Sequence, residues 1–212
     1  MKIVIFANGE MDSGNFFVKN AENSDLLICC DGGSNYAAAL GLTPDVIVGD
    51  FDSINQDIIA KFVDDGVVFE KYPKHKDATD LELAVSTAIS KNPDEIIILG
   101  AFGGRPDHFL GNIHALMPAA KAGIRAYLLS STAKAALIYN YLEIDKENYD
   151  HISLIPITTE VKGIFTTGLE YALQNEAIEI GCTKGISNKF TTKTAKISLR
   201  KGILLAICTK SN

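Results

Sequence analysis

The chain has 212 residues, of which 47% are apolar and 22% are charged, a composition typical of a globular protein rather than a disordered one. Its formal net charge is −6 and it contains no block of lysine and arginine, which argues against a nucleic-acid-binding surface. The four cysteines form no C-x-x-C pair, so we expect buried reduced thiols rather than a zinc site or disulfides. Residues 2–6 start an apolar run without a secretory leader, and no apolar segment reaches membrane-spanning length, so we expect a cytoplasmic protein.

The first two thirds of the chain alternate between strand and helix patterns. Apolar runs that predict buried strands occupy residues 3–6, 26–30, 46–48, 67–69, 95–99 and 125–129. Helical patterns cover residues 34–40, 55–64, 80–89 and about 106–122. Uninterrupted apolar strands with helices between them predict a parallel sheet that is covered on both faces.

From about residue 133 the helical periods end. Short alternating runs follow at residues 151–157, 161–167, 177–181, 195–199 and 203–208, with turn residues between them. Regularly spaced short strands predict an antiparallel sandwich or barrel. The expected fold is therefore α/β: a parallel, Rossmann-like domain over residues 1–132, followed by an antiparallel β-sandwich domain over residues 133–212.

The stretch at residues 46–54 combines a predicted strand with two carboxylates. Asp50 and Asp52 follow Gly49, and in an extended chain residues i and i+2 point to the same side. Two close carboxylates resist ionising together unless a cation joins them, and Mg²⁺ is the usual partner for hard oxygen ligands. Residues 53–56 equally fit the capping box of a helix start. This segment alone leaves both interpretations open.

Polar clusters follow several of the predicted strands, at residues 31–33, 49–53, 76–80 and 103–108. Each has a structural explanation by itself, such as the capping box at residues 79–82. In a doubly wound sheet, however, these loops converge on one crevice. That crevice would contain Asp50, Asp52, Asp77, Asp80 and Asp107, together with Lys76, Arg105 and several glycines. Glycine backbone and Arg105 suit phosphate, and the acids require a divalent ion, so we predict metal-bridged polyphosphate chemistry.

The same motifs, in the same order, resemble those of the thiamine pyrophosphokinase family. The resemblance continues through Asn112, residues 168–171 and residues 185–188, and so covers nearly the whole chain. It implies transfer of a pyrophosphoryl group from ATP to the hydroxyethyl oxygen of thiamine, giving AMP and thiamine diphosphate. It also implies a homodimer whose active site is shared between the α/β domain of one chain and the β domain of the other.

The resemblance implies a role for individual residues. Asp50, Asp52 and Asp80 would hold Mg²⁺ and, with Arg105, carry the catalysis. Ser187 and Asn188 would meet thiamine. The nucleotide would be contacted by a larger set, namely Asp31, Gly32, Gly33, Lys76, Asp77, Thr79, Gly104, Asp107, His108 and Asn112.

Two questions stay open at this point. The chain has no tryptophan, so Tyr171 and Phe190 are the candidates for cation–π contact with the thiazolium ring, although each also suits a β-sandwich core. The alternative functions are a diphosphokinase of the same fold acting on another hydroxymethyl heterocycle, such as a pterin, and an ATP-binding module without turnover. A dehydrogenase is disfavoured because residues 8–14 lack the G-x-G-x-x-G spacing.

Overall fold

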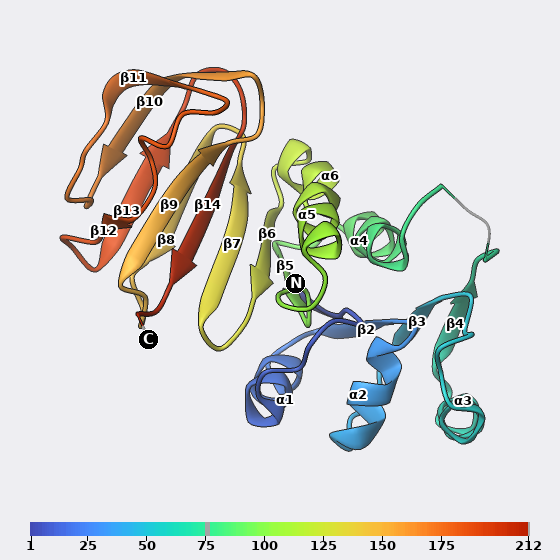
Figure 1. Ribbon diagram of the computed structural model, residues 1–212. Helices are drawn as coiled ribbons and strands as arrows, with labels where there is room; N and C mark the ends of the chain where they lie inside the picture. Colours follow the sequence, from blue (N-terminus) through green and yellow to red (C-terminus); the bar gives the residue numbers. More distant parts are fainter. Residues whose placement is uncertain (75–76, 212) are drawn as a thin grey trace. The chain divides into compact units, whose positions relative to one another are not determined.

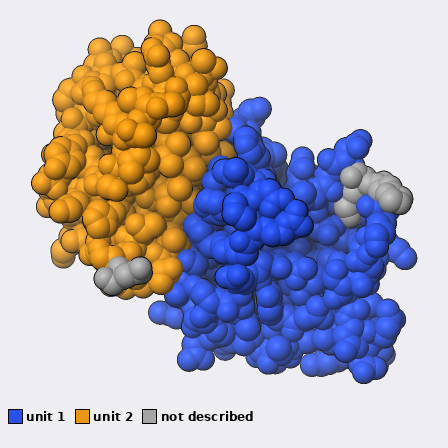
Figure 2. Space-filling model, in the orientation of Figure 1, with its two compact units in different colours: residues 1–131 blue, residues 132–212 orange. Residues whose placement is uncertain are grey.

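The structure is a computed structural model that describes residues 1–74 and 77–211. The chain divides into two compact units, residues 1–131 and 132–212, coloured blue and orange in Figure 2. Within the described residues, no helix is long and apolar enough to cross a membrane.

Unit 1 is built on a parallel sheet in the order β6-β5-β1-β2-β3-β4. The strands are β1 (Lys2–Phe6), β2 (Leu26–Cys30), β3 (Val46–Gly49), β4 (Val68–Lys71), β5 (Glu95–Leu99) and β6 (Arg125–Leu129). After a charged first residue, β1 and β5 are apolar and buried, because helices exclude water from both of their faces. The predicted parallel α/β domain is therefore confirmed.

The helices of unit 1 lie on both faces of this sheet (Figure 1). One face carries α1 (Gly14–Glu22), α2 (Gly33–Ala39) and α3 (Gln56–Asp64), and the other carries α4 (Asp80–Ser90), α5 (Pro106–Ala115) and α6 (Met117–Lys121). The sequence patterns did not predict α1. The single helix expected over residues 106–122 is wrong: it is interrupted at Leu116, because Pro118 lacks the N–H that would continue the helical hydrogen bonds.

The strand order creates a position where neighbouring loops diverge. The chain runs outward from β1 to β4 and then returns to place β5 on the other side of β1. The loops that follow β1 and β5 therefore lead to helices on opposite faces of the sheet, α1 and α5. Ligands of open α/β sheets bind at such a switch point, at the carboxyl ends of the strands.

Unit 2 folds as antiparallel sheets in its described part. One sheet has the order β12-β9-β14-β7 and the other has the order β11-β10-β13-β8. The strands are β7 (Ala133–Ile138), β8 (Tyr141–Asp145), β9 (His151–Pro156), β10 (Glu160–Thr167), β11 (Gln174–Glu179), β12 (Asn188–Lys189), β13 (Thr194–Ser198) and β14 (Leu204–Thr209). Buried and less buried positions alternate along β9, as a sheet with one apolar face requires. The predicted antiparallel β domain is confirmed, although β7, β8 and the two-residue β12 were not predicted.

Candidate active site

A cavity of about 680 Å³ opens at the carboxyl ends of the unit 1 strands. The loops after β1, β2, β3 and β5 line it, together with the first turns of α4 and α5. Its volume lies within the range of pockets that bind small molecules. The cavity therefore coincides with the switch point of the sheet.

Backbone hydrogen bonds join the loop after β1 to the loop after β5, and both loops line this cavity. The Ala7 N–H donates to the Leu99 carbonyl and the Gly9 N–H donates to the Gly100 carbonyl, both at 2.8 Å. A Cβ at Gly9 would lie 2.3 Å from the Gly100 oxygen, so only glycine permits this approach. The hydroxyl of Tyr36, from α2, donates to the Gly9 carbonyl at 2.7 Å. These contacts hold the loops in one arrangement.

Three carboxylates meet at one side of the cavity. Oxygen atoms of Asp31, Asp50 and Asp52 lie within 4.8 Å of one another. Asp31 is only 5% exposed, and its Oδ1 has no hydrogen-bond partner among the described residues. Burial raises the pKa of Asp31, hydrogen bonds from Ser53 offset part of that rise, and the nearby negative charge of Asp80 adds to it. This arrangement is unfavourable without a cation and fits a divalent ion well.

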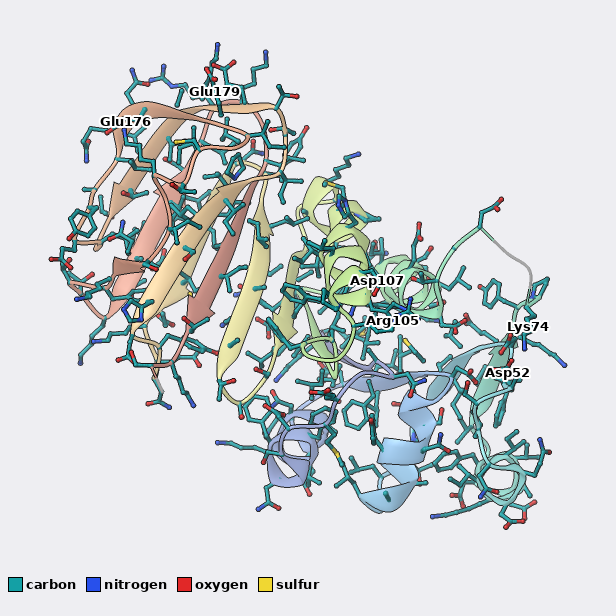
Figure 3. All side chains as sticks on the ribbon, viewed as in Figure 1. Asp52, Lys74, Arg105, Asp107, Glu176 and Glu179 are labelled. Carbon is teal, nitrogen blue, oxygen red and sulfur yellow. The ribbon has the colours of Figure 1, made fainter. Side chains whose placement is uncertain are left out.

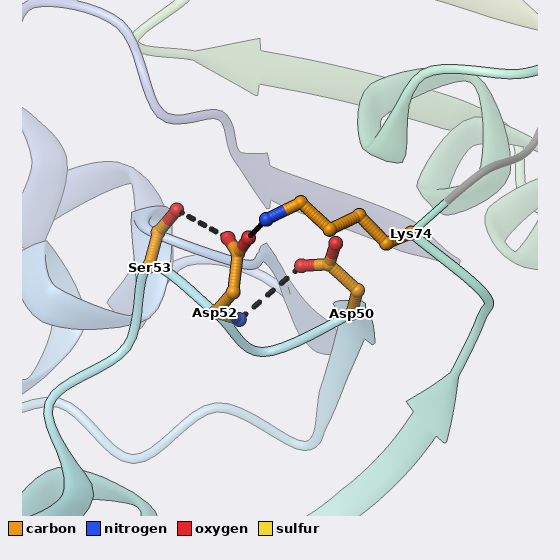
Figure 4. A network of polar contacts seen from close by, with 4 residues as sticks. All are labelled: Asp50, Asp52, Ser53 and Lys74. Atoms are coloured by element: carbon orange, nitrogen blue, oxygen red, sulfur yellow. Dashed lines mark hydrogen bonds and ion pairs between the residues drawn. The ribbon is translucent and has the colours of Figure 1, made fainter.

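The two acids of the 49–53 motif approach each other through a turn. We expected an extended chain at Asp50 and Asp52, and this is wrong because β3 ends at Gly49 and Phe51 has a φ of +70°. The Asp52 N–H instead donates to Oδ1 of Asp50 at 3.2 Å (Figure 4). A bulky residue in the left-handed region is strained, and here the Phe51 ring packs edge-on against Phe69 at 5.3 Å between centroids.

Asp52 has a partner at each carboxylate oxygen. The Ser53 hydroxyl donates to Oδ1 at 3.0 Å, and the Lys74 ammonium contacts Oδ2 (Figures 3 and 4). Lys74 holds the pKa of Asp52 below its usual range, with a smaller contribution from Ser53. The sequence analysis did not include Lys74 in the site.

Asp80 lies at the start of α4 and lines the same cavity. Its Oδ1 would be 3.4 Å from a Cβ at Gly49, so the carboxyl group packs beside the end of β3. Asp80 is not in the group of carboxylates whose oxygens lie within 4.8 Å of one another, which consists of Asp31, Asp50 and Asp52. Asp31, which we expected at the nucleotide, takes the place in this group that we expected for Asp80. Thr79 caps the helix, since its Oγ1 accepts from the Glu82 N–H at 3.2 Å.

Arg105 and Asp107 form a two-point ion pair at the start of α5 (Figure 3). Nε of Arg105 lies 3.1 Å from Oδ1 of Asp107, and Nη2 lies 2.6 Å from Oδ2. Arg105 lowers the pKa of Asp107 to about 2. Both residues line the cavity, so the guanidinium is held at its edge by a carboxylate of the same loop.

Most of the expected site residues come together in this cavity. Those that line it are Asp31, Asp50, Asp52, Thr79, Asp80, Gly104, Arg105, Asp107, His108 and Asn112. Gly32, Gly33 and Asp77 are not among its lining residues, and Lys76 lies outside the described residues. A Cβ at Gly33 would lie 2.3 Å from the Phe6 carbonyl oxygen, so this glycine permits α2 to begin close to β1.

Several lining residues were absent from the sequence-based set. They are Asn8, Gly9 and Glu10 after β1, Tyr36 on α2, and Phe102 after β5. Residues 8–10 directly follow the first predicted strand and therefore end at the same edge as the other motifs. Their position after a strand could have predicted that residues 8–10 line the cavity. Tyr36 reaches the cavity only through the packing of α2.

The two loops expected to meet thiamine are joined by Asn188 in unit 2. Asn188 is 5% exposed; its side-chain oxygen accepts from the N–H groups of Tyr171 (3.0 Å) and Lys189 (2.9 Å), and its NH₂ donates to the Tyr171 carbonyl (2.8 Å). Ser187 is exposed, and its N–H donates to the Ser153 hydroxyl at 3.0 Å. Phe190 is 8% exposed and belongs to the core, whereas Tyr171 is 64% exposed.

A parallel α/β sheet whose switch-point cavity is lined by an acidic cluster and an arginine is typical of one class of protein, the α/β enzymes of phosphoryl transfer. Comparison with known families is more specific. The model "Thiamin pyrophosphokinase, catalytic domain" matches residues 17–128, and the model "Thiamin pyrophosphokinase, vitamin B1 binding domain" matches residues 140–204. The chain belongs to the thiamine pyrophosphokinase family and has thiamine pyrophosphokinase activity, a step in thiamine diphosphate biosynthesis.

Individual relatives agree with this assignment. A thiamine pyrophosphokinase of Bacillus subtilis is 36% identical over 184 residues, which cover 86% of each chain. A thiamine pyrophosphokinase of Oryza sativa subsp. japonica is 29% identical over 213 residues, which cover 88% of this chain and 80% of the relative. The crystal structure of the thiamine pyrophosphokinase from Bacillus subtilis superposes with a TM-score of 0.88 at 32% identity, covering 100% of both chains. The match to a vitamin B1 binding domain favours thiamine over a pterin as the acceptor.

Proposed function

We propose that the unit 1 cavity binds the polyphosphate of ATP together with Mg²⁺, and that its acidic cluster holds the ion during pyrophosphoryl transfer to thiamine. One observation carries the proposal: three carboxylates lie within 4.8 Å of one another, and one oxygen of the buried Asp31 has no partner among the described residues. Carboxylates this close repel, and oxygen ligands suit Mg²⁺. Asp31, Asp50, Asp52 and Asp80 form the proposed ligand set.

The residues at the opposite edge of the cavity suit phosphate. Mg²⁺ held by the acidic cluster would supply positive charge to the polyphosphate, and Arg105 is a second positive group that lines the cavity. Gly103 and Gly104 both have positive φ and carry no side chain over their backbone N–H groups. The amino terminus of α5 follows directly and favours an anion. Asn112 supports this loop by donating to the Ala101 carbonyl at 3.0 Å.

The products define which bonds change. The hydroxyethyl oxygen of thiamine bonds to the β-phosphorus of ATP, the bond from that phosphorus to the α,β-bridging oxygen breaks, and AMP leaves with the bridging oxygen. In a loose transition state the attacking alcohol needs orientation more than activation, so positioning and charge neutralisation provide most of the rate. We assign late acceptance of the hydroxyl proton to Asp80, which lines the cavity beside the cluster.

The β-sheet unit provides the proposed thiamine contacts. Ser187 is exposed next to the Asn188 side chain, and the exposed Tyr171 offers an aromatic face for a cationic ring. We further propose a homodimer in which the cavity of one chain faces the thiamine-binding loops of its partner, and a cytoplasmic location. Sedimentation of the purified chain tests the dimer, since a monomer at assay concentration excludes a shared site.

Substitution of Asp52 by asparagine tests the metal assignment. We expect D52N to fold normally but to lose most of its turnover and its response to Mg²⁺, because the variant lacks one anionic ligand of the cluster. D64N, which changes an exposed acid of α3, serves as the matched control. The assay follows AMP formation from ATP and thiamine at increasing Mg²⁺. Wild-type turnover by D52N would contradict the metal assignment, and ADP as product would contradict transfer of a pyrophosphoryl group.

A further inference from the structure

Lys74 places a positive charge at the acidic cluster. It lies three residues beyond the end of β4, and its side chain extends back so that the ammonium contacts Oδ2 of Asp52 (Figure 4). The Lys74 side chain is 70% exposed, so solvent and not packing surrounds most of it. The ion pair therefore depends on charge and can be broken at little cost.

The Lys74 ammonium occupies Oδ2 of Asp52, a carboxylate that belongs to the acidic cluster. The other oxygen of Asp52 accepts from the Ser53 hydroxyl at 3.0 Å, so both oxygens already have a partner. An ammonium and a divalent ion at the same carboxylate repel each other strongly over a few ångströms. A divalent ion bound at Asp52 would therefore compete with the Lys74 ammonium for this carboxylate.

We propose that Lys74 is an exchangeable internal counter-ion, which neutralises Asp52 when the cluster holds no metal and competes with the divalent cation for that carboxylate. The inference rests on the proposed metal site. In the metal-free protein the lysine relieves the repulsion among three close carboxylates. Its presence weakens metal binding until the ammonium leaves Asp52.

Direct metal binding without nucleotide tests the competition. Mn²⁺ is titrated into the metal-free protein and the free ion is followed by electron paramagnetic resonance, which does not depend on turnover. Because exposed ion pairs are worth about 0.2–1 kcal/mol, we expect K74M to bind Mn²⁺ about 1.4- to fivefold more tightly than the unchanged protein. K74R keeps the charge and should bind like the unchanged protein. The difference should shrink as NaCl rises from about 0.05 M to about 0.5 M, because salt screens exposed charges.

K162M is the matched control for the loss of one surface charge. Lys162 belongs to unit 2, where it pairs with Glu160 at 2.8 Å, and its side chain is 52% exposed. We expect its Mn²⁺ affinity to equal that of the unchanged protein. Equal or weaker binding by K74M, or an equal gain in K162M, would overturn the role of Lys74 alone. Absence of Mn²⁺ binding in every protein, K74M included, would overturn the metal site as well.

Discussion

Replacing Asn188 by alanine removes the side chain that ties residues 168–171 to β12. Three hydrogen bonds disappear: two that its oxygen accepts from backbone N–H groups and one that its NH₂ donates to the Tyr171 carbonyl. Each is worth about 1 kcal/mol net, and leaving a buried partner unpaired costs more. Because Tyr171 is largely exposed, water replaces part of the loss. We therefore expect N188A to lower the free energy of unfolding by about 2–3 kcal/mol.

Urea denaturation followed by circular dichroism measures this loss, since the chain has no tryptophan to report on unfolding. With a slope of about 1–3 kcal/mol per molar urea, the midpoint should fall by about 1–2 M. N140A, which truncates an exposed asparagine in the same unit, should leave the midpoint unchanged. The KM for thiamine should rise in N188A, because the loop that carries Tyr171 loses its attachment.

A loss of thiamine binding without a loss of stability would refute the structural role of Asn188. If N188A lost thiamine binding while its midpoint matched that of N140A, the amide would be acting on the substrate and not on the loop. N188D sharpens the distinction, because aspartate keeps the oxygen acceptors but cannot donate to the Tyr171 carbonyl. On our reasoning it should be destabilised at neutral pH.

Substitutions at Asp31, Arg105 and Gly33 give three further predictions. D31N should stabilise the metal-free protein, because it removes a buried charge beside other carboxylates. An increase of about 1 kcal/mol in the free energy of unfolding corresponds to a melting temperature about 2–4 °C higher. The same variant should bind Mn²⁺ more weakly. R105Q should return the pKa of Asp107 from about 2 toward its ordinary value of about 3.9, as measured by carboxyl NMR titration. Because that pKa is lowered on folding, the ion pair stabilises the fold above about pH 4 and the contribution is lost as the pH falls toward 2, a dependence that R105Q should lack. G33A should destabilise by about 1–3 kcal/mol in urea denaturation, because its Cβ would lie 2.3 Å from the last carbonyl oxygen of β1, whereas G111A, in an open part of α5, should not destabilise.

The sequence was sufficient for the parallel sheet because the necessary signals are local. An apolar run followed by glycine and acids predicts a strand that ends at a polar edge, as at residues 46–50 and 26–31. Residues 106–122 show where the apolar pattern misleads. Their apolar period continues through Pro118 and predicts one helix, but Pro118 cannot donate a helical hydrogen bond, so the segment forms two helices, α5 and α6.

The residue types of the site were also evident before the structure. Acids, glycines and an arginine after successive strands predicted a polyphosphate site, and ten of the expected residues line the cavity. Residues 8–10 also lie at the carboxyl end of a predicted strand, but they were not included in the predicted site. Their glycine spacing was compared only with that of dinucleotide-binding loops, which it does not match.

Only the tertiary structure decided how these groups contact one another. It replaced the extended chain at Asp50 and Asp52 with a turn at Phe51, and it brought Asp31 into the acidic cluster. It also brought Lys74 to Asp52 and the Asn188 amide to the backbone of Tyr171. The physical reason is that strand and helix patterns arise from neighbouring residues, whereas carboxylate distances, ion pairs and buried hydrogen bonds depend on segments far apart in the chain that only packing brings together.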